Sequence, residues 1–449
     1  MRKFIFILVS VLMVAGFFGL SCGRGDRFMP TMTQSDDSSA LSSTADDDDN
    51  YTSIYDKDIN NIEPIMKSII DGDVRTLAWL VAYPLSRAYP LKDIENGQQM
   101  AAYFDVLFDD SIKDKLRRST VKDWSEYGWR GYSIFDGTLW VTPELLWAVN
   151  HRSKREKALL DSLERKEMSS LHPSLRGNGW QTVGCFGSAE EGMVVRIDSR
   201  GEQYKDEQYR MSIYHKGSSF AGKPDVCLTG TIDVQGTIHD VYYTFKGKGV
   251  EYVLNDPPMS CLASLTVHKL YNGEENDYQL ARCYWLDLIE KDKVVTPSHI
   301  PLPTQTICEG KDKNGKPRRF YVKQTDDMLS ELWVDDKKID DVLYEGMGVP
   351  EMDAFPSPDG RYVYVVTDIH ANGAPFSCFV YQINTQSLRV KLIDNGAGFY
   401  KTRDGFSIIV PRCVNPDAES NAEMRYMVHD EFYGFEGKKK RIGKERELM

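Results

Sequence analysis

The chain has no excess of positive charge. Its 449 residues include 55 lysines and arginines against 67 aspartates and glutamates, which gives a net charge of −12 at pH 7. Nucleic-acid binding depends on a basic surface that neutralises phosphates. The composition therefore excludes nucleic acid as an expected partner. The one basic run, Lys438 to Arg441, is followed closely by Glu445 and Glu447, and it predicts a solvated terminus.

Catalytic signatures are missing as well. The sequence has no Gly-x-Ser-x-Gly nucleophile elbow, no phosphate-binding P-loop, no Gly-x-Gly-x-x-Gly fingerprint and no His-Glu-x-x-His pair. Its eight histidines are scattered without the paired spacing of metal ligands. We therefore predict no catalytic residue, no metal site and no cofactor. Binding or scaffolding is favoured over catalysis.

Cysteine is scarce, and none of the eight cysteines belongs to a Cys-x-x-Cys motif. One pair has a suggestive spacing, because Cys261 and Cys283 lie 11 residues before and after Asn272 of an Asn-Gly turn signal. In a hairpin centred there, the two side chains would face each other across the strands, within reach of a disulfide. Two buried thiols are the equal alternative.

Long hydrophobic runs are also few, and the exception is residues 4–20. This run follows Arg2-Lys3 and precedes Ser21-Cys22, and its 17 residues are at the lower limit for a membrane span. The arrangement resembles a bacterial lipoprotein signal, although Gly19 stands where that pattern expects leucine. The resemblance implies a signal peptide of residues 1–21 and acylation of Cys22, palmitate included, which would anchor the chain in the cell envelope. An ordinary cleaved signal or an uncleaved anchor is the alternative.

Residues 22–54 have few large apolar side chains and are rich in Ser, Thr and Asp. Such a segment cannot bury enough surface to offset the entropy of ordering, so it predicts a flexible tether behind the lipid. The signal and this acidic segment together resemble Bacteroidota-type envelope lipoproteins. That resemblance implies an outer-membrane location, facing either the periplasm or the cell surface.

Residues 55–172 combine helical and extended patterns. Apolar residues recur at intervals of three and four between Ile59 and Ile70, a second such run begins near Asn96, and a highly charged one covers 153–171. Between the last two, Asp136-Gly137 separates two apolar runs and predicts a β-hairpin. These patterns predict an α+β domain.

Several short motifs support a more specific resemblance for residues 60–150. They are Asp71-Gly72-Asp73, Tyr83-Pro84-Leu85, Asp123-Trp124, Gly128-Trp129-Arg130-Gly131 and Gly137-Thr138-Leu139-Trp140. They resemble uncharacterised bacterial envelope proteins of the nuclear-transport-factor-2-like fold. The resemblance implies a cone-like α+β domain, in which helices close one side of a curved sheet and leave a pocket inside. It brings no known activity with it.

Five residues fall on or around the first hairpin of that sheet and are candidates for the pocket: Asp123, Trp124, Trp129, Arg130 and Trp140. A carboxylate, a guanidinium and three indoles would suit a polar ring such as a sugar, held by stacking and hydrogen bonds. In the alternative interpretation, Asp123 and Arg130 form a salt bridge and the tryptophans plug the open face of the sheet.

The chain after Pro173 is rich in strand patterns. Residues 173–296 predict an antiparallel sandwich or small barrel, and a proline-rich joint at 297–303 separates them from a β-rich segment at 297–449. In that segment, Ser357-Pro358-Asp359-Gly360 precedes alternating valines and aromatics, with an echo at Asp404-Gly405. Residues 320–410 thus resemble β-propeller blades. A β-meander with Asp-Gly turns is the alternative.

The function expected from these features is that of a lipid-anchored envelope protein. It would bind a glycan, a cell-wall fragment or another envelope protein, or serve as a scaffold. The alternative is a ligand-binding or enzymatic pocket in the cone-like domain, acting on a sugar-like or cell-wall-derived molecule.

Overall fold

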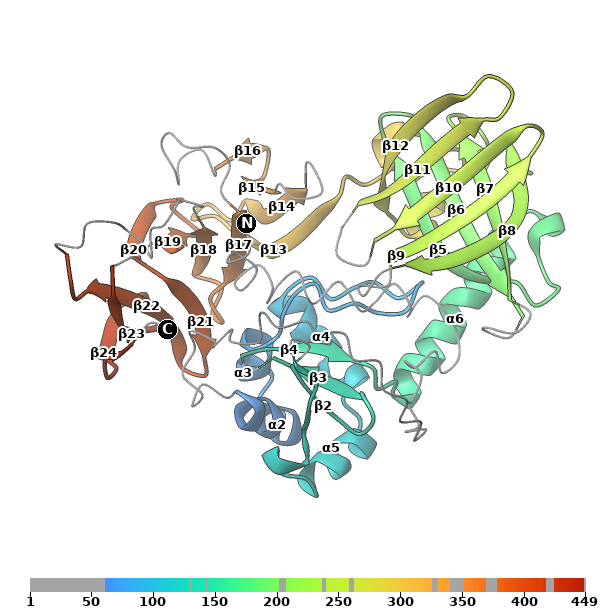
Figure 1. Cartoon of the computed structure of the whole chain (residues 1–449). Coiled ribbons are helices and arrows are strands. Elements are labelled where there is room, and N and C mark those ends of the chain that lie inside the picture. The colour runs from blue at the N-terminus through green and yellow to red at the C-terminus, as the bar shows by residue number, and fades with distance from the viewer. Residues whose placement is uncertain are drawn as a thin grey trace, which may run out of the picture.

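The computed structural model describes residues 61–447 except 129–130, 143, 202–206, 236–239, 258–261, 325–329, 340–350, 369–377 and 417–423. Three parts follow one another along the chain (Figure 1): a helical module with a small sheet, an eight-stranded barrel, and three further antiparallel sheets. The predicted β-rich character of the chain beyond residue 173 is confirmed. The predicted signal and tether, residues 1–54, lie outside the described residues.

The helical module covers residues 61–171. Four of its α-helices, α3 to α6, begin where a side chain accepts a backbone N–H at the first turn, as Asp73 does from Thr76 and Asn96 from Gln98 and Gln99. Asp136-Gly137 turns the chain between β2 and β3 as predicted, with positive φ at both residues. The elements are α2 (Ile62–Asp71), α3 (Val74–Trp79), α4 (Gly97–Leu107), α5 (Asp110–Arg117), η1 (Val121–Asp123), β1 (Ser125–Glu126), β2 (Tyr132–Ile134), β3 (Leu139–Val141), β4 (Leu146–Val149) and α6 (Lys154–Ser170).

Helix α6 has the predicted position, and most of its buried residues are charged. Leu159 is 37% exposed. The buried positions are Glu156, Leu160, Glu164 and Glu167, so three of the four carry a carboxylate. Buried carboxylates need charged or hydrogen-bonding partners, and for Glu156 and Glu167 these come from other elements, as described below.

Residues 181–282 form a closed antiparallel barrel, the second of the two architectures predicted for residues 173–296. Each strand pairs with the next along the chain, and β12 returns to β5 to close the ring. The strands are β5 (Gln181–Ser188), β6 (Met193–Arg200), β7 (Gln208–His215), β8 (Val226–Gln235), β9 (Asp240–Gly247), β10 (Val250–Asp256), β11 (Leu262–Lys269) and β12 (Glu274–Arg282); η3 (Pro173–Leu175) precedes them, and α7 (Trp285–Lys291) and η4 (Pro297–His299) follow.

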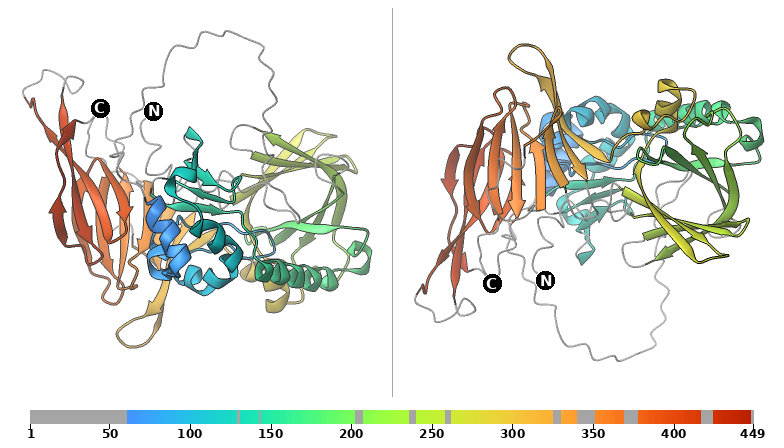
Figure 2. Two further views of the ribbon diagram at one scale, coloured as in Figure 1. Left: turned by 90° about the horizontal axis from the view of Figure 1, so that it is seen from below. Right: turned by 90° about the horizontal axis from the view of Figure 1, so that it is seen from above.

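Three antiparallel sheets, two of four strands and one of five, follow the barrel and are arranged like propeller blades. The first consists of β13 (Thr304–Lys311), β14 (Pro317–Gln324), β15 (Ser330–Val334) and β16 (Lys337–Lys338), and the second of β17 (Glu351–Pro356), β18 (Tyr362–Asp368), β19 (Cys378–Asn384) and β20 (Val390–Gly396). The third consists of β21 (Gly398–Thr402), β22 (Gly405–Cys413), β23 (Tyr426–Gly434) and β24 (Lys439–Ile442), with β25 (Arg446–Glu447) paired to β23. Figure 2 shows the second and third sheets stacked side by side.

The three sheets share a sequence repeat that is wider than the predicted one. In each sheet a glycine with positive φ sits at the turn between the first two strands: Gly315, Gly360 and Gly405. An Asn or Asp precedes each of them, and they recur every 45 residues. The Asn314-Gly315 turn therefore belongs to the same series as the two Asp-Gly turns that the sequence indicated.

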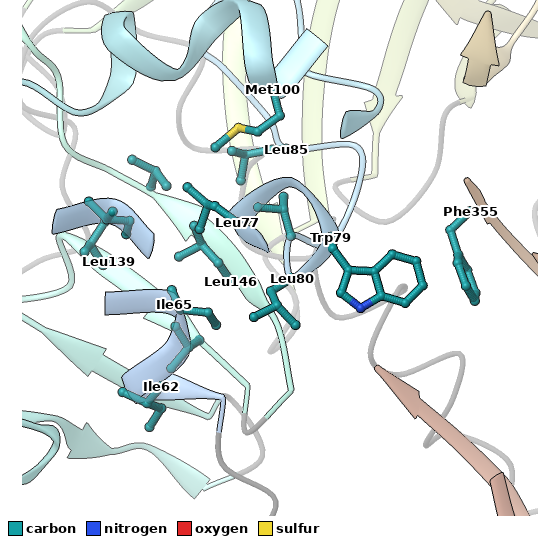
Figure 3. Close-up of a cluster of buried hydrophobic side chains, with 14 of the residues drawn as sticks. Ile62, Ile65, Leu77, Trp79, Leu80, Leu85, Met100, Leu139, Leu146 and Phe355 are labelled. Carbon is teal, nitrogen blue, oxygen red and sulfur yellow. The ribbon is translucent and has the colours of Figure 1, made fainter. Parts of the chain in front are cut away.

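The helical module and the second and third sheets share one hydrophobic core (Figure 3). Trp79 of α3 lies edge-on to Phe355 of β17, with ring centroids 5.5 Å apart. Its indole N–H donates to the carbonyl oxygens of Thr402 and Gly405, at 2.8 and 3.1 Å. Because a common core makes these parts one packing unit, Trp79 joins the first described helices to a sheet more than 300 residues later.

Candidate functional site

Asp123 is held by local hydrogen bonds. It ends the short helix η1, and one of its carboxylate oxygens accepts from the backbone N–H and the hydroxyl of Thr120, at 2.7 and 3.0 Å. Together with Thr120 it forms a capping box, which satisfies N–H groups at the start of a helix. Its carboxylate is therefore engaged in fixing the turn before the small sheet.

Trp124 and Trp140 lie in two separate cores. Trp124 is 8% exposed, belongs to the large core of the helical module, and donates its indole N–H to the sulfur of Met66 at 3.1 Å. Trp140 packs in a smaller cluster, 5.5 Å from the ring centroid of Trp147. Trp129 and Arg130 lie outside the described residues, so the five-residue pocket stays a prediction.

A shallow hollow of about 330 Å³ does lie beside Asp123. It is bordered by Lys115, Arg118 and Ser119 on one side and by Ile134 and Phe135 on the other. Neither Trp124 nor Trp140 lines it. Among its described lining residues, only Phe135 offers an aromatic face for a sugar ring.

The strongest electrostatic feature is a polar seam where the helical module meets the barrel, and sequence reasoning missed it. Arg196 on β6 is fully buried and forms ion pairs with Glu167 of α6 and with Asp198, both at 2.9 Å. Arg210 on β7 pairs with the other oxygen of Asp198 at 2.6 Å. Burial alone would lower the pKa of Arg196, but the carboxylates of Asp198 and Glu167 raise it above its ordinary value.

The extended segment between α3 and α4 completes the seam. Arg87 makes a two-pronged ion pair with the buried Glu156 of α6, through Nε and Nη2 at 2.8 Å each. Tyr89 donates its hydroxyl to Glu167 at 2.8 Å and accepts the backbone N–H of Trp285 at 3.1 Å. The seam therefore ties α6, the barrel and the start of α7 together.

A small cavity of about 50 Å³ lies in this seam. Arg87, Tyr89 and Asp93 line it from the helical module, and Arg282 and Cys283 line it from the barrel. Burial raises the pKa of Asp93 to about 6, against the opposing effect of the hydrogen bond from the Arg87 backbone N–H. The space suits a few water molecules, because small-molecule sites occupy roughly 300 Å³ or more. The seam therefore has the character of a structural joint.

A sequence signal for the seam did exist. In Val194-Val195-Arg196-Ile197-Asp198 two charges interrupt an otherwise apolar strand, and charged side chains at such positions call for charged partners. Glu156, Glu164 and Glu167 follow the three- and four-residue spacing of one helix face. Neither pattern indicates which partner it meets, because the two lie on separate elements.

Two of the three cysteines singled out from the sequence, Cys22 and Cys261, lie outside the described residues. Cys283 is described as a free thiol, and its sulfur lies 3.3 Å from that of Cys185. The predicted pairing of Cys261 with Cys283 stays a prediction, while Cys185 enters as a neighbour that the sequence did not indicate.

The barrel interior is apolar, and its inward-facing side chains differ in how far they are exposed to solvent. On β7, the inward-facing Tyr209, Met211 and Ile213 are at most 2% exposed. On β8, residues alternate between partly buried and exposed along the whole strand, and Val226 and Leu228 are on the partly buried, inward face. The other side chains that pack against this core while only partly buried are Ile232, Tyr252, Val267 and Tyr278. Partly exposed and fully buried side chains thus alternate on this side of the interior, because the inward Val241, Tyr243 and Phe245 of β9 are at most 2% exposed.

The two ends of the barrel differ in chemistry. At the end facing the helical module, Arg282 pairs with Asp256 at 2.7 Å, close to the polar seam. At the other end, the β11–β12 turn carries Leu270 and Tyr271, which are 58% and 73% exposed.

No group of three or more His, Cys, Asp or Glu side chains suited to a metal ion occurs among the described residues. Across the same residues, no helix combines the length and the apolar character needed to cross a membrane.

Comparisons with known proteins identify no family. No family model matches the sequence, and no curated protein matches it. Among solved structures, a mutant of Synechocystis apocarotenoid oxygenase aligns at 13% identity over 59% of this chain and 58% of that one, with a TM-score of 0.16. The chain therefore spans less than two thirds of that protein.

Two further structures align in the same way. An uncharacterised protein of Listeria monocytogenes shows 10% identity over 56% of this chain and 62% of that one, with a TM-score of 0.17. A putative 6-phosphogluconolactonase of Bacteroides fragilis shows 8% identity over 60% and 81%, with a TM-score of 0.14. Likenesses this weak carry no argument about the fold or the function of this chain.

Proposed function

We propose that this chain is a lipid-anchored envelope protein that binds a small apolar molecule inside the β5–β12 barrel. In this proposal the helical module and the three sheets are the scaffold that holds the barrel. The observation that carries the proposal is the set of apolar side chains on β8, β10, β11 and β12 that pack against the barrel core while only partly buried. An eight-stranded barrel encloses a space that is either filled by side chains or able to hold one small ligand. Because several inward side chains are only partly buried, we favour a barrel that holds a ligand.

The strand β8 supports the proposal in detail. Its outward residues, such as Cys227 and Thr229, face solvent, while Val226 and Leu228 face the interior. Leu228 lies over the backbone of β9, where a Cβ added at Gly247 would come within 2.5 Å of its side chain. Glycine at this position therefore leaves room for the Leu228 side chain on the inner face of the barrel.

In this proposal the ligand enters at the end of the barrel away from the polar seam, where Leu270 and Tyr271 are exposed. Tyr271 lies close to the β9–β10 turn, because a Cβ added at Gly249 would come within 4.0 Å of its ring. An apolar ligand entering here would cover surface that is now in contact with water. Each Å² of apolar surface removed from water contributes about 25 cal/mol.

The decisive experiment is a fluorescence titration with N-phenyl-1-naphthylamine, an apolar dye that brightens on leaving water. The wild-type chain should give a saturable increase. Leu228→Lys should weaken binding about tenfold or more, because it places an ammonium group in the apolar interior. Thr229→Lys, on the outward face of the same strand, is the matched control and should bind as the wild type does.

Thermal unfolding should show both lysine variants to be folded. A wild type that gives no saturable signal, or two variants that bind the dye equally well, would remove the barrel as the binding site.

A further inference from the structure

Cys185 and Cys283 face each other across the β5–β12 pairing that closes the barrel. The β5–β12 register pairs Gly187 with Ala281 and Phe186 with Arg282, so the next pair in the series is Cys185 with Cys283. The backbone continues the ladder, because Cys283 donates its N–H to the carbonyl of Cys185 at 2.9 Å. The two sulfur atoms are 3.3 Å apart, and both side chains are almost completely buried.

The β5–β12 pairing is the shortest strand pairing in the barrel. The β5–β12 ladder contains two register pairs, whereas the neighbouring β5–β6 and β11–β12 ladders contain seven and eight. The two cysteines are also 98 positions apart in the chain, so a bond between them would enclose nearly the whole barrel. Directly opposed residues of antiparallel strands have the Cα separation that a disulfide requires.

We propose that Cys185 and Cys283 form a disulfide that closes the barrel. Formation removes two electrons and two protons from the pair of thiols. A disulfide-bearing oxidant accepts them: one thiolate attacks it to give a mixed disulfide and one released thiol, and the second thiolate then displaces the other thiol. The use of this bond in the cell depends on the proposed export of the chain to the envelope, because such compartments are oxidising.

The surroundings favour formation during folding rather than afterwards. Both cysteines line the small cavity of the polar seam, which has no room for a protein oxidant. Burial raises the pKa of the Cys283 thiol, so the folded, reduced chain would hold little of the reactive thiolate. Oxidation of the two thiols therefore takes place before β5 and β12 pair and bury them.

The test is refolding of the full purified chain from denaturant in a buffer of oxidised and reduced glutathione. Remaining thiols are then trapped with iodoacetamide, and the chain is digested without reductant and analysed by mass spectrometry. We expect a crosslinked peptide pair containing Cys185 and Cys283, two hydrogen masses lighter than the free peptides. The exposed Cys227 should carry the alkyl group. A peptide joining Cys261 to Cys283, or alkylation of both Cys185 and Cys283, would overturn the proposal.

Cysteine variants test whether the Cys185–Cys283 disulfide stabilises the closed barrel. Dithiothreitol should lower the Tm of the wild type and of Cys227→Ala by roughly 5 °C or more, and should leave the Tm of Cys185→Ala unchanged. A crosslink whose reduction leaves Tm unchanged would contradict the closing role. Because refolding takes place in vitro, a crosslink there with free thiols in cell-derived protein would count against export and not against the pairing.

Discussion

Tyr89 of the helical module lies flat against Tyr284 at the end of the barrel, with ring planes 2° apart and ring centroids separated by 5.9 Å. The Tyr284 hydroxyl also accepts the backbone N–H of Asp93. One stacked pair thus holds the extended segment that carries Arg87, Tyr89 and Asp93 against the barrel. The buried ion pairs and hydrogen bonds that join the helical module to the barrel lie around this pair.

The Tyr89 hydroxyl should contribute measurably to stability. Tyr89→Phe keeps the stack and removes the hydrogen bonds to Glu167 and Trp285. Leaving these buried groups unsatisfied should lower the free energy of unfolding by about 1–3 kcal/mol, measured by urea denaturation. Tyr127→Phe removes an exposed hydroxyl and is the control, expected to change little. Equal midpoints for the two variants would contradict the structural role of the seam.

Arg196 should be among the most sensitive positions in the chain. Arg196→Met keeps much of the side-chain volume but leaves Glu167 without its buried cation and Asp198 with Arg210 alone. Removing one partner of a buried pair typically costs about 3–5 kcal/mol, again measured by urea denaturation. Arg412→Met breaks the exposed pair with Glu445 and should have little effect. A stable, fully folded Arg196→Met protein would show that the seam is dispensable.

Glu144 should make stability depend on pH. Burial raises the pKa of this carboxyl to about 8, against the opposing effect of Lys401. The native chain therefore holds a proton that the unfolded chain, with an ordinary pKa of 4.5, releases. The resulting stabilisation is complete below about pH 4.5 and is lost as the pH rises through 8.

The measurement is the urea midpoint of the wild type and of Glu144→Gln between pH 5 and pH 8. The difference between the two proteins should shift steadily in favour of the variant as the pH rises. Taking this difference removes the contribution of Asp93, whose raised pKa acts in the same direction. Glu63→Gln, at an exposed position on α2, should follow the wild type. A difference that stays constant with pH would rule out a buried, protonated Glu144.

The predicted lipid anchor, Cys22, lies outside the described residues, so its test is a cell-fractionation experiment. Cys22→Ala should leave the chain without an acyl group and move it from the membrane to the soluble fraction, because the thiol is the attachment point that the signal implies. Cys227→Ala should remain with the membrane. Fractionation with a radioactive or clickable acyl label distinguishes the two. An acylated, membrane-bound Cys22→Ala protein would contradict the lipoprotein prediction.

Local patterns were sufficient for the features that depend on neighbouring residues. The period-two strands beyond residue 173, the helix at 153–171 and the turn at Asp136-Gly137 were all predictable, because backbone geometry and side-chain alternation act over a few residues. The 45-residue spacing of Asp359 and Asp404 also indicated the blade-like sheets. Its third member at Asn314 was missed because Asn replaces Asp there.

Only the tertiary structure decided which distant residues meet. The sequence alone allowed Cys283 to pair with Cys261, whereas closure of the ring by β5 and β12 brings Cys185 beside it. The highly charged pattern of residues 153–171 did not indicate which charges are buried, whereas in the structure Glu156 and Glu167 lie inward, paired with Arg87 and Arg196 of other elements. Trp124 and Trp140 are 16 positions apart and still enter different cores. Burial, charge pairing and ring closure depend on the whole chain, and no local pattern contains them.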